Sequence, residues 1–270
     1  ESDMTKSLYH TLKVHQIIEE THDSKSVVFE RPDLPAFDYK PGQFLTLRIP
    51  TEHALIARCY SLASAPGVDE GLKVTIKRVT NGLGSNWVCD NLKAGDSLEV
   101  LAPAGVFCPK SLEVDFVLFA GGSGITPVMS ILKACLQQNS GRVFLFYANR
   151  DERSVIFARE LQALCQRYPS RLTVMHWLES VQGLPTHAQL QAIAQPYTHA
   201  HAFVGWCMGD VLSIEMNSAA LRFFQSDDAF KQRGFTSAIG TDDRHHLSFA
   251  HFQIDTFDRF DGTVGDSNVL

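Results

Sequence analysis

The first hundred residues alternate apolar and polar side chains in short runs, a pattern typical of half-buried β-strands. Turn residues separate the runs, as in Lys40-Pro41-Gly42-Gln43 and Ala94-Gly95-Asp96. A helix opening at Gly84 and reaching Leu92 is expected to interrupt them. Six runs at close spacing predict an antiparallel Greek-key β-barrel; five of them are Leu12–Ile17, Ser26–Phe29, Phe44–Ile49, Lys73–Val79 and Ser97–Leu101.

Beyond residue 108 the period changes, and apolar runs alternate with helical segments. This pattern predicts an α/β domain with an open parallel sheet, which binds ligands outside the carboxyl ends of its strands. The domain boundary is expected at residues 108–114. The predicted strands are 115–120, 143–147, 172–177 and 201–204, and the predicted helices are 126–138, 154–168 and 187–194.

Charge and cysteine content narrow the possible functions. The chain has 270 residues and a net charge of -6, so no polybasic surface for nucleic acid or anionic lipid is expected. No apolar run is long enough to span a membrane and the first residues show no signal-peptide pattern, so a cytoplasmic protein is expected. The six cysteines have neither zinc-site nor plant-type ferredoxin spacing, which predicts free thiols and no metal or iron–sulfur cluster; they are Cys59, Cys89, Cys108, Cys135, Cys165 and Cys207.

The segment Arg58-Cys59-Tyr60-Ser61 combines three groups that suit a flavin. Arginine offers a fixed cation for a pyrophosphate, tyrosine an aromatic face for the isoalloxazine ring, and serine a hydroxyl for the ring's reactive nitrogen. Alone, the segment is more often a surface arginine at a strand end beside a core tyrosine than a flavin site.

A glycine-rich turn, Gly121-Gly122-Ser123-Gly124, follows the apolar run 116–120. Such a turn lets the backbone approach a phosphate, with the amides of the next helix pointing at it. The turn lacks the GxGxxG pattern of ordinary dinucleotide folds, but Thr126-Pro127 follows it. Proline in the first helical turn needs no amide donor and leaves the other amides free for an anion.

In this order and about sixty positions apart, the two motifs resemble the ferredoxin-NADP reductase superfamily. In particular, the chain resembles reductase components of bacterial oxygenases, of the ketosteroid hydroxylase and phenylacetyl-CoA epoxidase type. The resemblance implies that Arg58 holds the FAD pyrophosphate, Tyr60 stacks on the ring and Ser61 hydrogen-bonds flavin N5. The remaining implied flavin contacts are Ile76, Lys77, Arg78, Gly84, Ser85 and Asn86, and the implied NADPH or NADH contacts are Gly122, Gly124, Thr126, Pro127, Asn149 and Arg150.

Near its end the chain departs from this family. Where a Cys-Gly-Pro is expected the sequence reads Gly205-Trp206-Cys207-Met208-Gly209-Asp210, so Cys207 is either a displaced nicotinamide-side residue or an ordinary buried thiol. Segment 252–257 resembles the family's last strand, with Phe257 as the aromatic that covers the flavin. The resemblance divides the chain into an FAD-binding barrel (4–110), an NAD(P)-binding domain (111–262) and a linker or tail (263–270).

The expected activity is electron transfer from NAD(P)H through FAD to a one-electron acceptor, either an iron–sulfur protein or an oxygenase component. The expected catalytic residues are Ser61 and Cys207, and no acid–base pair is needed. A non-catalytic flavin- or nucleotide-binding regulatory module remains the alternative, because residues 205–210 differ from the family pattern.

Overall fold

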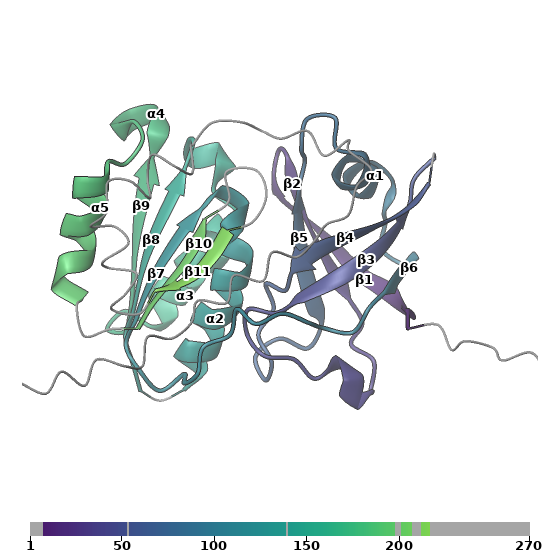
Figure 1. The fold of residues 1–270 in the computed structure, drawn as a ribbon, viewed down its shortest axis with the longest axis horizontal. Helices are drawn as coiled ribbons and strands as arrows, with labels where there is room; N and C mark the ends of the chain where they lie inside the picture. Colours follow the sequence, from purple (N-terminus) through teal and green to yellow (C-terminus); the bar gives the residue numbers. More distant parts are fainter. Residues whose placement is uncertain (1–7, 53, 139, 198–200, 207–211, 217–270) are drawn as a thin grey trace, which may run out of the picture. The chain divides into compact units, whose positions relative to one another are not determined.

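The computed structural model describes residues 8–52, 54–138, 140–197, 201–206 and 212–216, the last two ranges as backbone only. The N-terminal sheet is antiparallel and has six strands in the order β4-β3-β6-β1-β2-β5 (Figure 1). Leu62, directly after β4, bridges Val74 of β5, so the two ends of this order meet and close the barrel. The strands are β1 (His10–Thr21), β2 (Ser24–Phe29), β3 (Phe44–Pro50), β4 (Leu55–Ser61), β5 (Leu72–Lys77) and β6 (Ser97–Val100).

The barrel interior is built by the alternation seen in the sequence. Leu45, Leu47 and Ile49 of β3 are fully buried, and the residues between them are partly exposed. A short 3-10 helix η1 (Pro35–Phe37) and helix α1 (Leu83–Asn91) add to this core.

The second sheet has five strands in the order β11-β10-β7-β8-β9. Strands β10, β7, β8 and β9 are parallel to one another, and β11 is antiparallel to β10. The strands are β7 (Phe116–Gly121), β8 (Val143–Asn149), β9 (Leu172–Leu178), β10 (His201–Trp206) and β11 (Leu212–Met216). The helices are η2 (Gly122–Gly124), α2 (Ile125–Gln137), η3 (Glu152–Ser154), α3 (Ala158–Arg167), α4 (Glu179–Gln182), α5 (His187–Ala194) and η4 (Gln195–Tyr197).

Both faces of this sheet are covered by helices (Figure 1). Along β7, Leu118 faces α2 and α3, whereas Phe119 faces α5. A strand buried on both faces has to be apolar at every position, which explains the continuous apolar run of the sequence.

The predicted antiparallel barrel and parallel α/β domain are confirmed, but several element boundaries were wrong. The helix expected from residue 154 begins at Ala158, because Val155 is extended and Phe157 has a left-handed φ of 62°. Strand β5 ends at Lys77 and not at Val79, and β10 continues through Trp206 where 201–204 was expected. Strand β11 was not predicted.

Arg171 closes the C-terminal end of α2 with a set of charged hydrogen bonds. Its guanidinium donates to the carbonyl oxygens of Gly141 (2.8 Å), Leu136 (3.2 Å), Cys135 (3.2 Å) and Ser140 (2.6 Å). These carbonyls lie at and beyond the negative end of the helix dipole.

We expect Arg171→Ala to lower the free energy of unfolding by about 3 kcal/mol, because several charge-assisted bonds are lost together. Arg142→Ala is the matched control, since Arg142 is 76% exposed and pairs with Asp115 on the surface; its loss should change stability by less than about 1 kcal/mol. Denaturant unfolding of both variants measures the difference. Equal destabilisation would contradict the capping role of Arg171.

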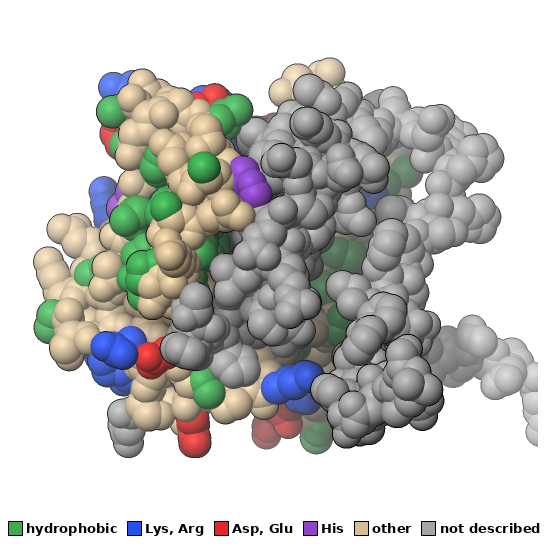
Figure 2. Space-filling view, turned by 60° about the vertical axis from the view of Figure 1, so that its left-hand side comes forward, with side chains coloured by type: hydrophobic (Ala, Val, Ile, Leu, Met, Phe, Trp, Pro, Cys, Tyr) green, Lys and Arg blue, Asp and Glu red, His purple; other side chains and the backbone are tan. Residues whose placement is uncertain are grey.

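No helix in the described part of the chain is both long and apolar enough to cross a membrane. Figure 2 shows the side that lies on the left in Figure 1, where hydrophobic and charged side chains are mixed. The Lys and Arg side chains visible there do not gather into a continuous field.

Candidate cofactor site

Strand β4 presents the Arg58–Ser61 motif at its carboxyl end. Arg58 pairs with Leu47 of β3, and Tyr60 pairs with Leu45 of β3. Because Arg58 and Tyr60 are two residues apart on one strand, their side chains lie on the same face of the sheet. Tyr60 is half-buried against the barrel core. Within the described chain, the Arg58 guanidinium makes one hydrogen bond, from Nη1 to the Ala57 carbonyl (2.8 Å), and no ion pair.

The N-terminus of helix α1 lies next to Arg58. A Cβ atom built on Gly84 would come within 3.3 Å of Arg58 Cγ, so the glycine lets the helix pack directly on the arginine side chain. The N-cap is Gly82, and no side chain caps the helix. Ser85 Oγ accepts a hydrogen bond from the Val79 amide (3.2 Å) and holds the preceding turn in place. A guanidinium beside free helix amides suits the two phosphates of FAD.

The neighbouring side chains around this helix are already engaged. Arg78 forms an ion pair with Asp90 (2.6 Å), and Asn86 Nδ2 donates to the Val79 carbonyl (3.1 Å). Lys77 Nζ lies 3.7 Å from Asp23. Any flavin contact from the segment that contains Arg78 would therefore come from its backbone, as the resemblance implies.

The Gly-rich turn forms η2 between β7 and α2. Gly122 has a φ of 52°, and the Ile125 amide points back to its carbonyl. Tyr147 of β8 donates from its hydroxyl to the same carbonyl (3.0 Å), and Thr126 Oγ1 donates to Ser123 O (3.1 Å). Helix α2 has no side-chain cap, so no side chain of the helix start occupies the place where its N-terminus would bind a phosphate.

At the carboxyl end of β8, Asn149 is buried, and neither its Nδ2 nor its Oδ1 has a partner within the described chain. A buried amide without partners costs free energy unless a ligand supplies the hydrogen bonds. The neighbouring Arg150 is exposed. Because the parallel strands β7 and β8 end together, Asn149 lies at the same edge as the Gly-rich turn, and the residues present fit a nicotinamide nucleotide.

The segments that carry the two motifs are joined by a buried hydrogen bond. Ser64, three residues after Ser61, accepts from Ser130 Oγ of α2 at 2.6 Å, and η2 contacts β5 of the barrel. Ala63 packs in the core of the nucleotide-side sheet. The segment that follows the β4 motif therefore lies against α2.

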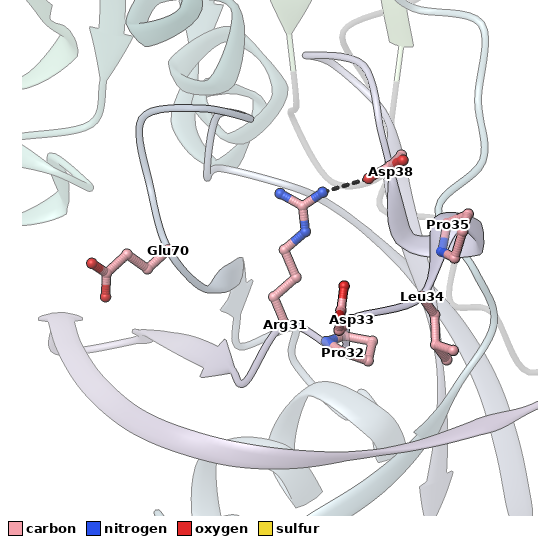
Figure 3. Close-up of a pocket in the computed structure, with 7 residues that line it drawn as sticks. All are labelled: Arg31, Pro32, Asp33, Leu34, Pro35, Asp38 and Glu70. Atoms are coloured by element: carbon pink, nitrogen blue, oxygen red, sulfur yellow. Dashed lines mark hydrogen bonds and ion pairs between the residues drawn. The ribbon is translucent and has the colours of Figure 1, made fainter.

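A surface pocket of about 380 Å³ lies elsewhere, around Arg31 (Figure 3). Arg31 is already neutralised by Asp38 at 2.7 Å, and Asp33 and Glu70 also line the pocket. Three carboxylates around one paired arginine disfavour an anionic cofactor. The pocket is not the flavin site.

Sequence reasoning overlooked Tyr147 as the residue that holds the Gly-rich turn, and it overlooked the contacts of Lys133. The signal for Lys133 was available, because a lysine inside the apolar run 128–136 needs a partner. Cys207 and Phe257, together with the segment 207–210, lie outside the described residues.

Two family models match the chain: an oxidoreductase FAD-binding domain over residues 11–108 and an oxidoreductase NAD-binding domain over residues 118–199. The ferredoxin reductase component of a 3-ketosteroid-9-alpha-monooxygenase from Rhodococcus rhodochrous is 62% identical over 196 residues, which are 72% of this chain and 56% of the relative. One of the subunits of the 1,2-phenylacetyl-CoA epoxidase of Escherichia coli is 32% identical over 175 residues, 62% of this chain and 48% of the relative.

Among solved structures, phthalate dioxygenase reductase aligns with a TM-score of 0.62 and 26% identity, covering 73% of this chain and 60% of that protein. The chain spans about half the length of the curated relatives it matches. The order of the two domains, the barrel followed by the parallel sheet, agrees with these matches. The chain belongs to the ferredoxin-NADP reductase-like family of FAD- and NAD-binding reductases.

Proposed function

We propose that this chain is the reductase part of a multicomponent monooxygenase and passes electrons from NADH or NADPH through FAD to a one-electron acceptor. One arrangement supports the proposal. Arg58 lies beside helix α1, which has no side-chain cap, and the Gly-rich turn leads into α2, which has none either. The hydrogen bond between Ser64 and Ser130 joins the segment after the Arg58 motif to α2. The flavin would supply the conversion of a two-electron donor to one-electron transfer, and the protein supplies binding and alignment.

Nine of the predicted site residues have a role in this proposal. Arg58 and the first amides of α1 bind the diphosphate, Tyr60 stacks on the ring, and Ser61 donates to N5. On the nucleotide side, the turn with Gly122 and Gly124, the α2 residues Thr126 and Pro127, and the β8 end with Asn149 and Arg150 bind NAD(P)H. We also propose the domain boundaries 4–110, 111–262 and 263–270.

The proposed acceptor is a separate iron–sulfur protein or the oxygenase component itself. The name of the Rhodococcus relative makes a ketosteroid monooxygenase the first acceptor to test. We further propose a reducing, cytoplasmic setting, supported by the free thiols of the described cysteines; burial raises the pKa of Cys135 to about 12.

Anaerobic titration of the purified yellow protein tests the activity. Addition of NADH or NADPH is expected to bleach the flavin absorbance, and oxidised nucleotide is the control. Dithionite should bleach it in every sample, which establishes that the bound flavin can be reduced. A flavin that dithionite bleaches and neither reduced nucleotide does would favour the regulatory module and contradict the proposed reductase.

A further inference from the structure

A cluster of two buried lysines and two partly exposed carboxylates joins the segment after the flavin motif to α2 and α3. Lys73 Nζ lies 2.6 Å from Glu160 Oε2, and Lys133 Nζ lies 2.9 Å from Glu160 Oε1 and 2.8 Å from Asp69 Oδ2. The Lys133 side chain is 3% exposed and that of Lys73 10%. Lysines are almost never buried this deeply unless they are paired, so Glu160 bridges two cations that depend on it.

Ser64 is fixed beside this cluster from several directions. Its hydroxyl accepts from the Tyr39 hydroxyl (2.9 Å) and from the Lys73 amide (3.0 Å), and its carbonyl accepts from Ser130 Oγ (2.6 Å). All of the described residues fall within one compact unit of the chain. The segment 62–73 is therefore held by hydrogen bonds to its own barrel and to α2.

Phe157, the residue before α3, contacts Lys73 through its ring. Phe157 is buried and has a φ of 62°, a left-handed conformation that costs about 1–2 kcal/mol for a residue with a Cβ atom. Its ring centre lies 4.8 Å from Lys73 Nζ, a cation–π distance. The turn at Phe157 starts α3 and places Glu160 in the first helical turn, within reach of both lysines.

These contacts are only a few residues along the chain from both proposed cofactor sites. Ser64 follows Ser61 by three residues, and Ser130 follows Thr126 by about one helical turn. Hydride transfer requires the reacting atoms to approach within about 3–3.5 Å. A small shift of the segment after Ser61 relative to α2 would therefore change the rate of hydride transfer strongly.

We propose that Glu160, together with Lys73 and Lys133, is a positioning residue for flavin reduction: it holds the segment after Ser61 against α2. The inference rests on the proposed function, because it concerns the alignment of the flavin with the nucleotide. Burial raises the pKa of Glu160, but Lys73 and Lys133 outweigh this effect and keep it below its ordinary value. The bridge is therefore charged at neutral pH.

The test uses variants that separate charge from folding. Glu160→Gln leaves two buried ammonium groups with one carboxylate, so the double variant Glu160→Gln with Lys73→Met restores the charge balance and keeps the pair Lys133–Asp69. Asp115→Asn is the matched control, because it removes a carboxylate from a surface ion pair with Arg142. Stopped-flow reduction at saturating NADH and NADPH, flavin retention, and hydrogen–deuterium exchange of segment 62–73 are measured for each.

The double variant is expected to reduce its flavin roughly 10-fold more slowly at saturating nucleotide, while FAD retention stays within about twofold. Amides of segment 62–73 should exchange faster than in the wild type, and Asp115→Asn should change neither quantity. An unchanged reduction rate in a folded variant with faster exchange would overturn the positioning role. If the flavin of the wild type is not reduced by either nucleotide, the proposed function fails. Unchanged amide exchange of segment 62–73 in the double variant would separately show that Glu160 does not hold this segment.

Discussion

Replacing Arg58 by alanine is expected to weaken FAD binding about 10- to 100-fold, the loss of one charge-assisted contact worth roughly 1.5–3 kcal/mol. The guanidinium lies beside the N-terminus of α1 and makes no ion pair within the described chain, so its charge is available to a diphosphate. Because Arg58 is exposed, the variant should fold normally. Fluorescence titration of the flavin-free protein gives the two dissociation constants.

Two comparisons make this experiment specific. Arg31→Ala removes an arginine that is already paired with Asp38, and it should leave FAD binding unchanged. FMN lacks the diphosphate, so its affinity should fall less than that of FAD in Arg58→Ala. Equal losses for FMN and FAD, or full flavin retention by Arg58→Ala, would show that the guanidinium does not bind the diphosphate.

Local patterns were sufficient where neighbouring residues decide the structure. Helix α5 begins and ends where the sequence placed it, because Thr186 and Gln189 form a capping box that fixes its start. Strands β7 and β8 were visible as apolar runs because helices cover both faces of their sheet. The Gly-rich turn could be predicted from its glycines, because glycine readily adopts a left-handed φ such as that of Gly122.

Distant contacts decided the rest. Residues 154–168 are compatible with one helix, but Phe157 adopts a left-handed conformation in which its ring lies against Lys73, which is far away in sequence. The apolar pattern of α2 likewise marks Lys133 as unusual without identifying its partners, Asp69 and Glu160. A cluster assembled from three separate segments leaves no periodic signal in any of them.

Gly42→Ala is expected to lower the free energy of unfolding by more than about 3 kcal/mol, because two effects combine at this position. Gly42 has a φ of +98°, which alanine adopts only with strain, and its added Cβ atom would lie 1.8 Å from the Phe107 carbonyl oxygen. Phe107 packs against the core of the nucleotide-side sheet, so the backbone there has little freedom to move away.

Gly95→Ala separates the two effects. Gly95 has a similar φ of +94°, but nothing lies within 4 Å of its added Cβ atom, so only the conformational strain of about 1–2 kcal/mol remains. Denaturant unfolding of both variants, followed by circular dichroism, measures the difference, which is assigned to the clash with Phe107. If the two variants are destabilised equally, the loop at Gly42 can move away from Phe107, and this close approach does not constrain the junction between the barrel and the second domain.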